Sequence, residues 1–144
     1  MLQSAVVDAS VLVSAFLFPN SIPGRVVIAA EQGLYKLHFS PILIEEAKRS
    51  LLNPRLKNKY KHTNDGIEAW CNSLHRIGNL IINPLPDIGP VCRDPDDDHV
   101  IAAALLVRAD CIVTGDQDLL DLLQHQNIRI MTARQFLDEI KENL

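Results

Sequence analysis

Three aspartates stand where a globular chain gains little stability from acids but could build a reactive site. Asp8 directly follows the apolar run 5–7, and Asp116 follows the apolar run 111–113 after a short turn. Asp98 lies at the start of a segment rich in alanine and leucine. Taken singly, each also suits an N-terminal helix cap, because aspartate accepts the free N–H groups of a first turn.

A fourth acid, Glu46, lies inside a predicted helix that opens with Ser40 and a proline. It stands beside Ala47 and three residues after Leu43, which places it at the edge of the face that packs toward the core. Its neighbour Glu45 points about 100° away around the helix and is the plainer surface acid. Glu46 is therefore the better candidate for a functional side chain.

If these four acids converge, several carboxylates share one small volume. Like charges at close range either raise each other's pKa values or require a cation that neutralises them. A site built from oxygens, without paired histidine or cysteine ligands, suits Mg²⁺ or Mn²⁺ better than zinc. The chemistry that such a site supports beside a phosphate is phosphodiester hydrolysis.

The elements that must position these acids alternate along the chain. Strands are predicted at 5–7, 37–39, 80–82, 111–113 and 128–131. Helices are predicted at 9–18, 23–32, 41–53, 65–77, 99–108 and 119–123, followed by a C-terminal helix capped by Thr132. This alternation predicts a three-layer α/β/α sandwich with a largely parallel central sheet, which binds ligands at the carboxyl ends of its strands. Asp8 and Asp116 are expected at such ends.

Length and composition indicate one domain over residues 1–144, with 47% hydrophobic and 22% charged residues. No uncharged apolar stretch approaches the roughly 18 residues of a membrane span. The start of the chain has no basic segment and carries Asp8 in its first apolar run, which argues against a signal peptide. Three cysteines without CxxC spacing are typical of reduced thiols, so we expect a cytoplasmic protein.

The net charge of −4, from 18 acids and 14 bases, argues against a nucleic-acid partner, but the charges are unevenly distributed. Segment 94–121 holds eight acids and one base, whereas segment 48–61 holds six bases and no acid. The six bases are Lys48, Arg49, Arg55, Lys57, Lys59 and Lys61. They suit either a solvated pair of helices or a rim that tracks phosphates, with Tyr60 as a stacking surface. Their place just after Glu46 favours the rim.

Three segments, VVDAS, SPILIEEAKRSLL and RDPDDDHVIAAALLVRADCIVTGDQDLL, resemble the PIN domain, and the resemblance extends from Val6 to about Phe136. It is closest to the branch of VapC-type toxins of bacterial toxin–antitoxin systems. The resemblance implies an α/β nuclease that depends on Mg²⁺ or Mn²⁺ and cleaves single-stranded RNA, leaving a 5′-phosphate and a 3′-hydroxyl. It further implies an antitoxin partner and a homodimer.

The resemblance also assigns site residues. It implies four catalytic acids, namely Asp8, Glu46, Asp98 and Asp116. Glu46 is selected because the family's helix glutamate lies six residues after the helix-opening serine, and Asp98 because it lies three positions before Ile101 in the next helix. The implied metal ligands are Asp8, Asp98 and Asp116, with Asp97 as a competitor of Asp98, Asp94 as its support and Asp118 as an extra ligand. Ser10 and Thr114, which accompany these acids, are expected substrate contacts. The basic segment 48–61 independently supplies the other expected contacts, namely Arg49, Arg55, Lys57 and Lys59.

Other interpretations stay open at this level. A PIN domain can serve RNA processing instead of toxicity, or bind RNA or a protein without turnover. A phospho-acceptor receiver domain requires a lysine at a later strand end, which we do not find. His99 is expected to be an ordinary residue of a first helical turn, with substrate contact as the alternative.

Overall fold

The computed structural model describes residues 2–142, so residues 1, 143 and 144 of the expected domain lie outside the described part. The described strands are β1 (Ser4–Val7), β2 (Lys36–Phe39), β3 (Asn79–Leu80), β4 (Cys111–Val113), β5 (Gln124–His125) and β6 (Ile128–Met131). The described α-helices are α1 (Ala9–Leu17), α2 (Ile22–Glu31), α3 (Pro41–Leu52), α4 (Pro54–Tyr60), α5 (Asn64–Ile77), α6 (Asp98–Val107), α7 (Gln117–Leu120) and α8 (Ala133–Glu142). A 3-10 turn, η1 (Pro95–Asp97), precedes α6.

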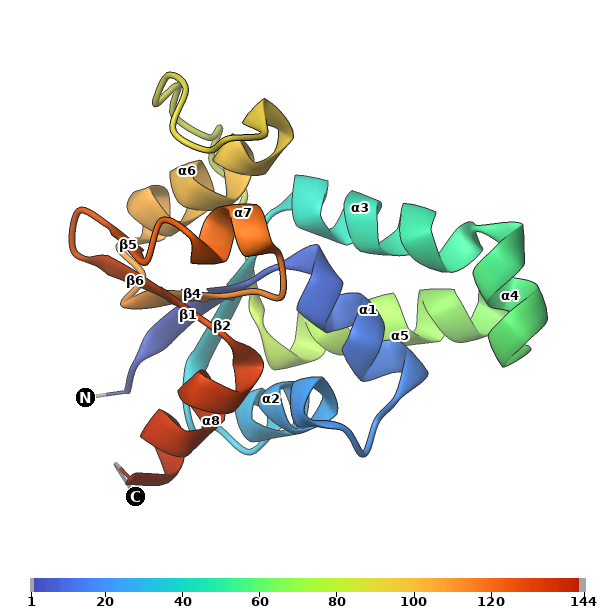
Figure 1. Ribbon diagram of the computed structural model, residues 1–144. Coiled ribbons are helices and arrows are strands. Elements are labelled where there is room, and N and C mark those ends of the chain that lie inside the picture. Colours follow the sequence, from blue (N-terminus) through green and yellow to red (C-terminus); the bar gives the residue numbers. More distant parts are fainter. Residues whose placement is uncertain (1, 143–144) are drawn as a thin grey trace.

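All these strands lie in one sheet with the order β3-β2-β1-β4-β6-β5, and only β5 runs antiparallel to its neighbour. Helices α6 and α7 lie on one side of the sheet and α2 and α8 on the other, while α3, α4 and α5 extend beyond it (Figure 1). The predicted three-layer architecture with a largely parallel sheet is confirmed. The central strands β1 and β4 are almost entirely buried, as their apolar sequences predict.

Several element boundaries differ from the prediction. The strand predicted at 80–82 is the short edge strand β3, after which Ile82 is 84% exposed. The helix predicted at 119–123 is α7, which begins earlier because the Asp116 side chain accepts from the Asp118 N–H and caps it. Strand β5 was not predicted, because its two residues lack an apolar pattern. Helix α4 is separate from α3, because Asn53 caps it and Pro54 occupies its first position.

The register of β1 and β4 brings distant acids to one edge of the sheet. Val7 pairs with Val113 in the parallel ladder, and the Asp8 N–H donates to the Val113 carbonyl at 2.9 Å. Both strands therefore end side by side, and the chain continues from them into Asp8 and into Thr114. Asp8, which follows β1, and Asp116, which follows β4, therefore lie close together at this edge of the sheet.

Among the described residues, no single helix combines the length and hydropathy that a membrane crossing requires, and α1 and α2 pass that test only as a pair bent by 97°.

Candidate metal centre

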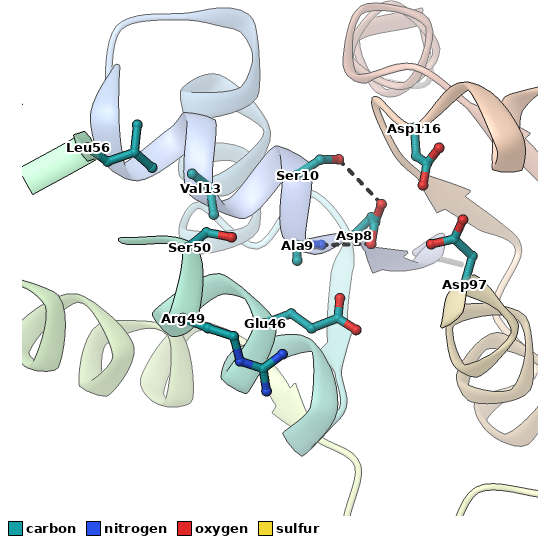
Figure 2. Close-up of a pocket in the computed structure, with 10 residues that line it drawn as sticks. All are labelled: Asp8, Ala9, Ser10, Val13, Glu46, Arg49, Ser50, Leu56, Asp97 and Asp116. Carbon is teal, nitrogen blue, oxygen red and sulfur yellow. Dashed lines mark hydrogen bonds between the residues drawn. The ribbon is translucent and has the colours of Figure 1, made fainter. Parts of the chain in front are cut away.

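A cleft of about 620 Å³ opens at the carboxyl ends of β1 and β4 (Figure 2). It is lined by Asp8, Ala9, Ser10, Val13, Glu46, Arg49, Ser50, Leu56, Asp97 and Asp116. Figure 2 shows the carboxylates of Asp8, Asp97 and Asp116 at one end, with Glu46 reaching toward them from α3. The cleft therefore gathers acids from four separate parts of the sequence.

Asp8 is the most deeply placed of these acids, at 6% exposed, and it caps α1. Its Oδ1 accepts from the Ala9 N–H at 2.8 Å, and its Oδ2 accepts from the hydroxyl groups of Thr114 at 2.7 Å and Ser10 at 3.3 Å. Burial raises the pKa of Asp8, and these hydrogen bonds oppose that rise. Asp8 thus acts both as a helix cap and as a fixed wall of the cleft, so the two interpretations drawn from the sequence do not exclude each other.

Asp97, Asp116 and Asp118 form a compact carboxylate trio. One carboxylate oxygen of each lies within 4.8 Å of the others, which is the only such group of potential metal ligands among residues 2–142. Burial, together with a hydrogen bond and the charge of Asp116, raises the pKa of Asp97 from 3.8 to about 7. The raised pKa reflects the cost of ionising Asp97 beside Asp116, and a bound cation would remove that cost.

The Oδ2 atom of Asp97 is buried and finds no hydrogen-bond partner within the protein. A buried carboxylate oxygen is a strong acceptor, and leaving it unpaired is costly. The donors around it are carboxylates, without histidine or cysteine, which is the ligand chemistry of Mg²⁺ or Mn²⁺. The residues present therefore fit a divalent cation.

Asp98, the preferred third acid at the sequence level, does not line this cleft. Its Oδ1 accepts from the N–H groups of Cys92 at 2.7 Å and Val91 at 3.3 Å, and these bonds lower the pKa of Asp98. Because η1 passes into α6 at this point, consecutive side chains diverge, and Asp97 faces the acids while Asp98 clamps the preceding loop. Of the two candidates for the third acid, the geometry therefore favours Asp97, which faces the cleft.

Glu46 reaches the cleft from α3 and has a partner that the sequence did not suggest. The Nε2 atom of His99, in the first turn of α6, lies 2.6 Å from Oε1 of Glu46. Their side chains are 14% and 34% exposed, respectively. His99 does not line this cleft, but it contacts an acid that does.

The two hydroxyl residues hold the acids in place. Thr114 is 1% exposed, and its Oγ1 donates to Asp8 and accepts from the Asp116 N–H at 3.0 Å. Because Thr114 is buried and does not line the cleft, its hydroxyl holds the acids in place, and the expected substrate contact by Thr114 is not supported. Ser10 is exposed and lines the cleft, where its Oγ also accepts from the Gly115 N–H at 3.1 Å.

The structure separates the expected basic contacts. Arg49 lines the cleft, whereas Arg55, Lys57 and Lys59 lie on α4 outside it. The Nζ of Lys57 donates to Asn64 Oδ1 at 2.5 Å, and the Nζ of Lys59 lies 5.3 Å from the ring centroid of Tyr60. These three bases therefore lie on α4 and are not part of the cleft wall.

Arg93 is a further residue that the sequence did not single out as a ligand partner. Its guanidinium lies 3.6 Å from Oδ1 of Asp118 and 3.5 Å from Oδ2 of Asp121. The Arg93 side chain is 75% exposed, so these pairs are worth little in stability. They do place a positive charge beside one acid of the carboxylate trio.

Comparison with known proteins supplies two findings. A family model described as the PIN domain matches residues 4–118. The chain is also 29% identical over 145 residues to an uncharacterized protein of Methanocaldococcus jannaschii, covering 95% of this chain and 91% of that protein. The matched segment contains every acid of the cleft.

Neighbouring substitutions separate the two adjacent aspartates. We expect Asp97→Asn to weaken Mn²⁺ binding by at least about tenfold, because it removes a ligand charge from the trio. Asp98→Asn should leave the affinity close to wild type, because the amide oxygen can still accept from Cys92 and Val91. Isothermal titration calorimetry of the full chain measures both. Equal losses, or a larger loss in Asp98→Asn, would contradict this assignment.

The raised pKa of Asp97 also predicts how stability depends on pH. Between about pH 4 and pH 7 the native carboxyl keeps a proton that the unfolded chain releases, so the stability of the metal-free protein falls as pH rises. We expect the melting temperature in EDTA to fall more steeply for wild type than for Asp97→Asn. Added Mn²⁺ at pH 8 should raise it mainly in wild type. Parallel pH profiles of the two proteins would rule this out.

Proposed function

The chain belongs to the PIN domain family, and from that premise we propose that it is a metal-dependent endoribonuclease that hydrolyses phosphodiester bonds of single-stranded RNA. Family membership implies a nuclease-type function, and PIN domains are generally metal-dependent nucleases. We further propose that residues 1–144 form one such nuclease domain.

The observation that carries this proposal is the buried, unpartnered Oδ2 of Asp97 within the carboxylate trio. A catalytically silent fold has no reason to keep this oxygen unpaired beside Asp116. We infer that Asp8, Asp97, Asp116 and Asp118 hold Mg²⁺ or Mn²⁺. A bound divalent cation supplies a more acidic water molecule and stabilises negative charge on the phosphate.

The chain's own residues then divide the remaining work. The Glu46 carboxylate accepts a hydrogen bond from the attacking water and orients it toward phosphorus. The water oxygen forms a bond to phosphorus as the bond between phosphorus and the 3′-oxygen breaks. The water loses one proton to solvent and the 3′-oxygen takes one up, so that the products carry a 5′-phosphate and a 3′-hydroxyl. Asp8 keeps its orientation because Thr114 and Ala9 both donate to its carboxylate. The exposed hydroxyl of Ser10 faces the cleft, where it can contact the RNA.

We propose that the RNA follows the cleft from the acids toward α4. Arg49 meets a backbone phosphate inside the cleft, and Arg55, Lys57 and Lys59 continue the positive track outside it. Leu56 belongs to α4 and also lines the cleft, which supports the continuity of this path. The ring of Tyr60 packs edge-on against that of Phe18, with 5.3 Å between the ring centroids. It thus offers an aromatic ring in a fixed position beside the basic residues, on which a base can stack.

A direct test is the cleavage of labelled single-stranded RNA by the purified chain with Mg²⁺ or Mn²⁺. We expect Asp8→Asn to abolish cleavage because it removes the charge of a metal ligand. Added EDTA should abolish cleavage because it removes the metal ion. Asp138→Asn, which changes an exposed acid on α8, serves as the matched control and should cleave normally. Cleavage that survives both Asp8→Asn and EDTA would refute the proposal. RNA binding without cleavage by wild type would favour a non-catalytic binding module.

We also propose that the enzyme is the VapC-type toxin of a bacterial toxin–antitoxin system, acting in the cytoplasm as a homodimer. This finer proposal rests on the sequence resemblance, and an RNA-processing role is the alternative. An antitoxin would suit the cleft because a basic side chain inserted among its acids would offset their repulsion.

The neighbouring gene separates the two roles. For a toxin we expect a small overlapping gene whose product binds DNA, forms a stable complex with this chain and suppresses RNA cleavage. Co-expression followed by co-purification and a cleavage assay measures both effects. A chain that has no such neighbour and that leaves bacterial growth unaffected when expressed alone would point to RNA processing.

A further inference from the structure

The bond between His99 and Glu46 joins two helices that approach the cleft from different directions. His99 belongs to the first turn of α6, and Glu46 lies in the middle of α3. Their separation along the chain is 53 residues, and the Nε2–Oε1 distance is 2.6 Å. A contact this short between remote segments fixes the relative position of both side chains.

We propose that His99 is a positioning residue, whose bond to Glu46 holds the carboxylate toward the aspartates of the cleft. This inference rests on the proposed nuclease function, in which Glu46 orients the attacking water. His99 itself does not line the cleft. It acts through Glu46.

Glu46 needs such a tether because a competing partner lies on its own helix. Arg49 stands three residues later, a spacing at which acidic and basic side chains pair readily. Yet no ion pair joins Glu46 to Arg49 within residues 2–142, and Figure 2 shows the Glu46 carboxylate directed toward the aspartates, with the Arg49 guanidinium below it and farther from them. The tether therefore keeps Glu46 at the acidic end and leaves Arg49 free for a phosphate.

The environment of His99 suits a fixed anchor. Its side chain is 14% exposed, and its other ring nitrogen, Nδ1, is buried without a hydrogen-bond partner in the protein. Such an unpaired nitrogen is a cost that packing alone does not explain. With no second protein partner to rotate the ring, Glu46 alone determines its hydrogen bonding. The Asp98 clamp on Cys92 and Val91 further fixes the turn that carries His99.

Kinetics of RNA cleavage test this role with four single variants and one double variant. His99→Leu removes the donor at similar volume, His99→Asn shortens it, and His99→Gln keeps an N–H that reaches about as far as Nε2. Glu46→Gln weakens the acceptor, and the double variant combines Glu46→Gln with His99→Leu. Melting temperatures confirm that each protein is folded, and His99→Asn takes the place of His99→Leu if the latter is not.

We expect kcat to fall about tenfold or more in both His99→Leu and Glu46→Gln, because each loses the oriented carboxylate. His99→Gln should recover a large part of the lost kcat, and His99→Asn should not. The double variant should be no slower than Glu46→Gln alone, because His99 has no other route to the reaction. Without His99, Glu46 should turn to Arg49 and weaken the contact of Arg49 with phosphate, so KM should rise in His99→Leu.

Wild-type kcat in His99→Leu together with an inactive Glu46→Gln would overturn the inference while leaving the proposed function intact. Losses that multiply in the double variant would also overturn it, since they indicate independent roles.

A readout without activity keeps the inference testable on its own. In metal-free protein, ¹H–¹⁵N spectra of the imidazole should show a proton on Nε2 of His99 whose signal moves in Glu46→Gln. An unchanged signal would overturn the inference even if RNA is cleaved. If wild type cleaves no RNA, the proposed function fails, and this spectrum alone decides whether His99 holds Glu46.

Discussion

The parallel pairing of β1 with β4 is the constraint on which the whole site depends. Two strands separated by more than 100 residues of chain lie in register at Val7 and Val113, and their carboxyl ends therefore deliver Asp8 and Thr114 to neighbouring points. The buried Thr114 hydroxyl then connects the two strand ends by bonding both Asp8 and the backbone of Asp116. A shift of one residue in this register would reverse the faces of the side chains and separate the acids.

The acids brought together in this way repel one another, and the surrounding residues are arranged to tolerate that repulsion. Asp8 receives three hydrogen bonds, whereas Asp97 keeps an unpaired oxygen and a strongly raised pKa. Hydrogen bonds thus stabilise the carboxylate of Asp8, whereas Asp97 lacks such compensation on one of its oxygens. The net charge of the chain does not reveal the acidic centre, because the acids of the centre and the bases of α3 and α4 lie in separate segments and largely cancel in the sum.

The sequence predicted the architecture well because the central strands are short apolar runs with few alternatives. Local sequence patterns predicted less well the side-chain directions and contacts that arise only where two elements meet. Asp97 and Asp98 are equivalent by composition, and only the passage from η1 to α6 separates their directions. The hydrogen bond between His99 and Glu46 joins residues 53 positions apart, and no spacing pattern within either helix predicts it. Strand β5 forms because β6 offers it an edge, not because its own residues favour a strand.

The contact between Arg93 and Asp118 has a thermodynamic consequence for cation binding. A cation bound at Asp118 would compete with the Arg93 guanidinium for the same carboxylate. Each would therefore weaken the binding of the other. By reciprocity, a change that weakens the contact of Arg93 with Asp118 would strengthen cation binding there, and the coupling would be small because the Arg93 side chain is exposed and also pairs with Asp121. Ionic strength screens the exposed Arg93 pairs far more than the buried acids. Salt would therefore act on metal affinity at this centre through Arg93 as well as through the acids themselves.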